Sequence, residues 1–204
     1  MNLPIQPVEE DRRLMQGAWL FLVSLAVFFV SCMILYAIYV MLRVAPLVEE
    51  ENSGIQPFYL PRNFLLTTVN LIAISILLHL SVGAIRREAR VDFVRYVTIA
   101  AILAGVFFAL QSIGLINMVE QMQKPGPAMK SLYGLTFFLV VIHALHVVGG
   151  AAGMAMVVMG IRRDKYDHER HFAVRFCALY WHFLDFVWII MMAGFTLAAY
   201  VSKA

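Results

Sequence analysis

Charged residues are scarce in this chain. Only 14% of its 204 residues are Asp, Glu, Lys or Arg, whereas about 25% is usual for soluble domains. Hydrophobic residues make up 62% of the sequence, whereas soluble domains usually contain about 45–50%. The composition therefore predicts an integral membrane protein. The calculated pI of about 9.0 does not indicate a nucleic-acid partner, because the basic residues lie between apolar runs rather than in one patch.

Cysteine is scarce as well, since Cys32 and Cys177 are the two in the chain and both fall in apolar runs. Two such cysteines do not make a disulfide framework. Carboxylates are almost missing from the apolar runs, where Asp185 is the only one. This leaves few candidates for acid–base or metal chemistry inside a membrane.

Five apolar runs are long enough to cross a bilayer, which takes about 20 residues as a helix. They cover residues 17–42, 64–85, 94–117, 132–161 and 176–200. The connections between them are short, so no soluble domain fits and residues 1–204 are expected to form one membrane domain. The predicted fold class is an all-α integral membrane protein, a bundle of five transmembrane helices.

The basic residues predict the orientation of this bundle. One side carries Arg12, Arg13, Arg86, Arg87, Arg90, Arg95, Arg162, Arg163, Lys165, Arg170 and Arg175. The other side carries Arg43, Arg62, Lys124, Lys130 and Lys203. Because basic loops stay in the cytoplasm, we expect the N-terminus to be cytoplasmic and the C-terminus to lie outside.

The last apolar run contains His182 and Asp185, which are three residues apart and would share one face of a helix. A carboxylate at the centre of a bilayer costs roughly 2.5 to 3.5 kcal/mol or more, so its presence points to a site. The pair could relay protons or could anchor neighbouring helices. We favour the anchor, because a proton path usually needs several acids along the bilayer. Trp181 and Trp188, seven residues apart, form a neighbouring stripe.

The fourth run contains His143 and His146, also three residues apart, followed closely by Gly149, Gly150 and Gly153. Small residues at this density let another helix approach closely. The histidines could hold a metal or haem, or could be hydrogen-bonded across helices. Zinc needs three or four ligands, and no cysteine accompanies this pair. We therefore expect a structural role, with no catalytic, metal or cofactor-binding residue in the chain.

Several uncharged polar side chains inside the second and third runs are further candidates for hydrogen bonds between helices. They are Thr67, Thr68, Asn70, Ser75, Gln111, Ser112 and Asn117.

Two motifs carry a family resemblance. Residues 143–150 read H-x-L-H-V-x-x-G, and residues 181–188 read W-H-F-x-D-x-V-W. Both the motifs and the spacing between them resemble subunit III of the haem–copper terminal oxidases. Looser similarity around residues 19–21 and 61–68 and at Gln111 extends the resemblance over nearly the whole chain, as in five-helix members of that family.

The resemblance implies a non-catalytic subunit of a respiratory complex that reduces O2 to water and pumps protons. Such a subunit binds no haem or copper itself, since those are in partner subunits. It packs beside catalytic subunit I, holds phospholipids and supports proton uptake. A bacterial cytoplasmic membrane is the expected location.

On this interpretation His143, His146, His182 and Asp185 form a polar cluster that links the last two helices. Trp181 and Trp188 pack against a neighbouring helix or lipid. The basic loop after the fourth run would contact lipid headgroups through Arg162, Arg163 and Lys165.

Two positions depart from the family pattern. Leu25 and Gly114 stand where members commonly have glutamates, so no role of those carboxylates applies to this chain. Two alternatives are a related subunit associated with a quinol oxidase or a nitric oxide reductase, and a small proton or solute transporter that uses His182 and Asp185.

Overall fold

The computed structural model describes residues 7–46, 58–123, 127–163 and 172–202. All the regular secondary structure in this part of the chain is helical. The helices are α1 (Pro7–Tyr39), α3 (Asn63–Arg86), α4 (Arg90–Gln121), α5 (Pro127–Arg162) and α6 (Phe172–Val201), and α1 continues into a short π-helical segment, η1 (Val40–Val44). Within the described residues, five helices are long and apolar enough to cross a membrane, which confirms the predicted class of a membrane helical bundle.

The apolar runs become helices because a bilayer offers no water to the backbone, so each N–H and C=O must be paired within the segment. Between α3 and α4 the chain reverses in a tight turn. Glu88 takes a left-handed conformation there, with φ at 58°, and the Ala89 N–H donates to the carbonyl oxygen of Ala84 at 3.0 Å. This short turn makes α3 and α4 antiparallel neighbours.

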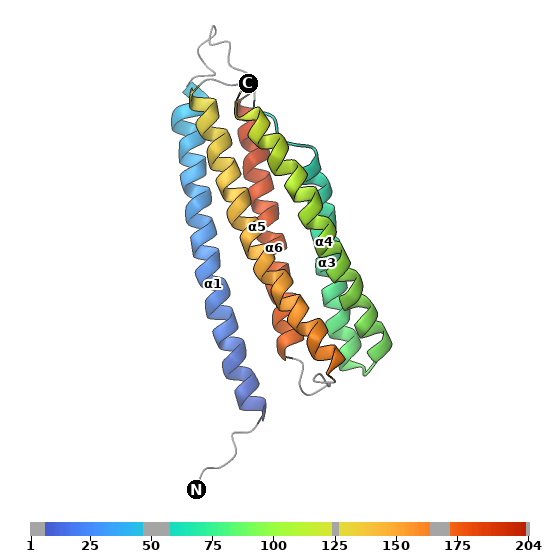
Figure 1. Ribbon diagram of the computed structural model, residues 1–204. Coiled ribbons are helices and arrows are strands. Elements are labelled where there is room, and N and C mark those ends of the chain that lie inside the picture. The colour runs from blue at the N-terminus through green and yellow to red at the C-terminus, as the bar shows by residue number, and fades with distance from the viewer. Residues whose placement is uncertain (1–6, 47–57, 124–126, 164–171, 203–204) are drawn as a thin grey trace.

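Helix α6 is the centre of the bundle, because it contacts α1, α3 and α5. In Figure 1, α1 lies on one side, α5 and α6 lie in the middle, and α3 and α4 lie on the other side. The start of α1, the α3–α4 turn, the end of α5 and the start of α6 lie at one end of the bundle. We call this the basic end, because the larger of the two predicted sets of basic residues belongs to it.

Helix α6 contributes several of the largest side chains of the core. Its residues Trp181, Leu184, Trp188, Met191 and Phe195 are each at most 1% exposed. By contrast, only 17% of the apolar window of α1 is buried, against 33% for that of α6. Most of the apolar surface of α1 is therefore left to lipid or to other membrane helices.

Candidate functional site

Helix α5 packs closely against α6 at Gly150. A Cβ atom at this position would lie 3.2 Å from side-chain atoms of Tyr180, Trp181 and Leu184. The indole N–H of Trp181 donates to the Gly150 carbonyl oxygen at 3.2 Å. Gly153, in contrast, has nothing within 4 Å of its Cβ position. One glycine of the predicted stripe therefore makes the close approach.

The two histidines of α5 lie in ring contacts. His143 is fully buried, and its ring is 5.1 Å from that of Trp188 and 6.3 Å from that of Phe29. The ring of His146 meets the same Phe29 ring edge-on, with the ring centroids 5.1 Å apart. Its Nδ1 is hydrogen-bonded to the carbonyl oxygen of Ile142, in the same helix, at 2.8 Å. Neither ring nitrogen of His143 has a hydrogen-bond partner in the part of the chain that the structure describes. The rings thus bring α1, α5 and α6 together by packing, where hydrogen bonds between helices were expected.

Trp188 joins α6 to α3. Its ring is fully buried and meets Phe64 edge-on at 5.6 Å. Its indole N–H donates to Thr68 Oγ1 at 2.8 Å. Trp181 and Trp188 therefore both pack against neighbouring helices, α5 and α3 respectively.

His182 faces α3. Its Nδ1 is hydrogen-bonded to Ser75 Oγ, and its ring is 5.8 Å from the ring of His79. Oδ1 of Asp185 is buried and has no hydrogen-bond partner among the described residues.

The structure places the four expected cluster residues in two groups. His143 and His146 lie with Phe29 and Trp188, whereas His182 lies with Ser75 of α3 and Asp185 follows it by three residues on the same face of α6. The cause is helical geometry, because α6 turns one face to α5 and another to α3. Within the described residues, no group of three or more His, Cys, Asp or Glu could hold a metal ion.

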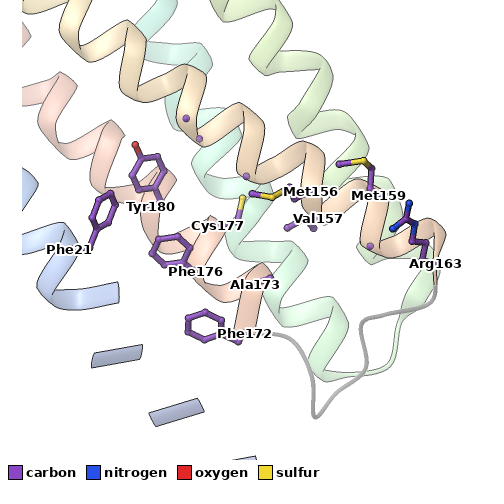
Figure 2. A pocket seen from close by; sticks show the side chains of 14 residues that line it. Phe21, Met156, Val157, Met159, Arg163, Phe172, Ala173, Phe176, Cys177 and Tyr180 are labelled. Carbon is purple, nitrogen blue, oxygen red and sulfur yellow. The ribbon is translucent and has the colours of Figure 1, made fainter. Parts of the chain in front are cut away.

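A cavity of about 630 Å³ opens between α1, α5 and α6. Aromatic rings line it together with the glycines of α5, and Arg163 belongs to its lining as well. Figure 2 shows Arg163 at one side of the cavity, next to the end of α5, and Phe21 and Tyr180 at the other. Arg162 is exposed and does not line the cavity. Lys165, the third predicted headgroup contact, lies outside the described residues.

Comparison with known protein families gives a match over almost the whole chain. A family model described as cytochrome c oxidase subunit III matches residues 7–199. The chain belongs to the cytochrome c oxidase subunit III family. The resemblance seen in the two motifs is thereby confirmed.

Curated subunit III relatives agree with this assignment. The chain is 29% identical over 140 residues to cytochrome c oxidase subunit 3 of Pisaster ochraceus. It is 31% identical over 144 residues to the protein of the same name from Heterololigo bleekeri. Each alignment covers 68% of this chain and about half of the relative, 50% and 51% respectively. The chain spans about half the length of the curated relatives it matches.

The two positions at which the resemblance predicted glutamates, Leu25 and Gly114, have apolar neighbours in the structure. Leu25 packs against the hydrophobic core. At Gly114, a Cβ atom would lie 2.5 Å from Cε1 of Phe64, a fully buried ring that also contacts Trp188. A side chain at position 114 would need this ring to move, so Phe64 takes the space beside Gly114.

Some polar residues of the second and third helices connect helices as predicted. Thr68 accepts the bond from Trp188, Ser75 meets His182, and Asn70 Nδ2 donates to the Leu103 carbonyl oxygen at 2.9 Å. Ser112 instead bonds within its own helix, and both amide atoms of Gln111 are buried without a partner.

The sequence did not predict which rings His79 and Phe29 contact. The histidine pair His79–His182 was hard to foresee, because it depends on how α3 and α6 are rotated about their axes. Phe29 carries no sequence signal that separates it from other aromatic residues of α1.

Proposed function

We propose that this chain is the non-catalytic subunit III of a respiratory haem–copper oxidase complex. The family match over residues 7–199 carries this proposal. The polar groups support it, because those of the two motifs hold helices to one another. Haem and copper belong to partner subunits in this proposal, and catalytic subunit I is the partner that the bundle packs against.

The orientation follows from the charges. We propose that the basic end faces the cytoplasm, since basic segments stay on that side. Location in a bacterial cytoplasmic membrane remains a prediction from the sequence.

A mild-detergent pull-down of the tagged full chain tests the proposed function. Membranes that carry the untagged chain serve as the control. We expect haem absorbance together with a large co-purifying subunit, identified by mass spectrometry as an oxidase catalytic subunit. A chain that is recovered alone and colourless would contradict the proposal, and so would a chain that carries haem without a partner.

The lipid-binding part of the proposal centres on the cavity between α1, α5 and α6. Its lining is mostly apolar and ends near a guanidinium group, that of Arg163. An acyl chain fits the apolar lining, and an anionic headgroup fits Arg163, because basic residues at the membrane surface attract anionic lipid by about 1 kcal/mol each. We propose that a phospholipid binds here with its phosphate near Arg163.

Replacing Arg163 with glutamine should therefore lower the amount of anionic phospholipid that stays bound. The expected decrease in affinity is roughly fivefold, which corresponds to about 1 kcal/mol. Native mass spectrometry of the purified chain measures the retained lipid. Arg87→Gln is the matched control, because Arg87 is exposed and does not line the cavity. An equal loss in both variants would show that general surface charge holds the lipid.

A further inference from the structure

A second cavity, of about 230 Å³, lies near the basic end between α1, α3 and α6. It shares no lining residue with the cavity of Arg163. Its polar side chains are His79 of α3 and both Arg175 and His182 of α6, and the indole of Trp19 from α1 lines it as well. The rest of the lining is apolar. The cavity therefore gathers nitrogen groups from three helices in an otherwise apolar wall.

Arg175 gives this cavity a positive charge that its lining does not balance. The side chain is half-buried, and no Asp or Glu is among the described residues that line the cavity. A guanidinium is always charged in proteins. A charge held away from water is unfavourable unless it is paired. An anion in the cavity would supply that pair.

His182 is oriented by α3 so that one of its ring nitrogens is left for the cavity. Its Nδ1 is hydrogen-bonded to Oγ of Ser75. When this hydroxyl donates to Nδ1, the proton of the neutral ring lies on Nε2. The ring then offers an N–H to a ligand.

His79 offers a second imidazole beside the first. It is exposed, and its ring centroid is 5.8 Å from that of His182. An N–H···O hydrogen bond spans about 2.9 Å between its heavy atoms. The two rings can therefore donate to different oxygens of one small ligand that lies between them.

We infer that this cavity binds a phosphate group, with Arg175 as its charge partner and His79 and His182 as further hydrogen-bond donors. The guanidinium can donate to two oxygens at once. A carboxylate has only those two oxygens, whereas a phosphate has others for the imidazoles. A water molecule takes about 30 Å³ in the liquid. The cavity thus has room for a phosphate group and part of the alcohol to which it is esterified.

Two sources can supply this group, a phospholipid headgroup at the membrane surface or inorganic phosphate in the adjoining water. Both present the same oxygens to Arg175, so the experiment has one arm for each. The inference goes beyond the proposed function, because the site is made by this chain alone and is separate from the cavity of Arg163.

The test is equilibrium binding to the full chain, purified without added lipid in dodecyl maltoside, a detergent that contains no phosphate. One arm measures radiolabelled inorganic phosphate by equilibrium dialysis. The other titrates phosphatidylglycerol and counts bound molecules by native mass spectrometry. Arg175→Gln should weaken the binding about tenfold, the effect of losing a hydrogen bond between charged groups.

Three further variants separate charge from hydrogen bonding. Arg175→Lys keeps the positive charge but not the planar fork, so it should weaken the binding only a few-fold. His79→Leu removes a donor and should weaken it about fivefold. His79→Gln keeps an N–H donor and should stay close to the original affinity. Circular dichroism checks that each variant is folded.

Arg95→Gln is the matched control. Arg95 is an exposed arginine near the start of α4, and it does not line the cavity. This variant should leave the affinity unchanged. Equal affinities in Arg175→Gln and Arg95→Gln would overturn the inference, and so would the absence of binding in both arms.

The lipid arm is repeated in Arg163→Gln, so that the two cavities are counted separately. Adding Arg175→Gln to this variant should remove a further bound lipid if the source is a headgroup. Binding of inorganic phosphate that depends on Arg175 identifies a soluble ligand and equally supports the site. If lipid is the only ligand and the double variant retains as much of it as Arg163→Gln alone, this second site does not exist.

The outcome is separate from that of the pull-down. A chain that recovers its oxidase partner but binds phosphate groups without regard to Arg175 retains the proposed function and loses this site. A chain without an oxidase partner but with binding that depends on Arg175 retains the site and loses the proposed function.

Discussion

Replacement of Trp188 by alanine is expected to lower the free energy of unfolding by about 3 kcal/mol. The indole ring is fully buried, contacts Phe64 and His143, and donates to Thr68. Loss of a buried tryptophan costs about 3 to 5 kcal/mol in soluble proteins. We expect the lower value of this range in a membrane protein. Exposing apolar surface to lipid costs little free energy, so the variant loses mainly packing contacts.

The measurement is an SDS titration of the purified chain in mild detergent, followed by circular dichroism. Trp188→Phe keeps a ring but removes the N–H, so it should lose only about 1 kcal/mol, the value of one hydrogen bond. Trp19→Ala is the control, because Trp19 is 53% exposed and should cost less than about 0.5 kcal/mol. Similar losses for Trp188→Ala and Trp19→Ala would contradict the importance of this contact.

Gly150→Val should separate α5 from α6. Three side-chain atoms of α6 already lie 3.2 Å from the position of a Cβ atom. Two further methyl groups cannot fit unless α6 moves away, which would also stretch the bond from Trp181 to the Gly150 carbonyl. Overpacking of this kind costs about 1 to 3 kcal/mol.

The same titration measures this loss, and the pull-down shows whether the variant still assembles. Gly105→Val is the matched control, because Gly105 is an exposed glycine of α4 with nothing within 4 Å of its Cβ position. We expect Gly105→Val to be close to neutral. If both valine variants were equally stable, the close approach at Gly150 would not be a main contact of the bundle.

The helices were the most predictable part of this protein. Four of the five apolar runs each lie within one helix of the structure, and the first extends from α1 into η1. A long apolar segment has no other way to satisfy its backbone in a bilayer. The helices extend beyond the predicted runs by several residues, for example to Arg90 at the start of α4. Polar residues at helix ends continue the helix outside the hydrocarbon region, where hydropathy carries no signal.

The candidate site was predictable in its residues and less so in its contacts. Sequence spacing placed His182 and Asp185 on one face of a helix, and His182 is hydrogen-bonded to Ser75 of α3. Spacing along one helix could not say which other helix that face meets. The histidines of α5 were expected to join the same cluster, yet they lie among the aromatic rings of α1 and α6.

The sequence by itself determined that the chain crosses a membrane as five helices and belongs to the subunit III family, because hydropathy and local motifs are properties of consecutive residues. Tertiary structure alone decided that Gly150, rather than Gly153, lies against α6. It also decided that His182 meets Ser75 of α3. Both depend on the rotation and spacing of whole helices, which result from the packing of many side chains at once and leave no mark in any single stretch of sequence.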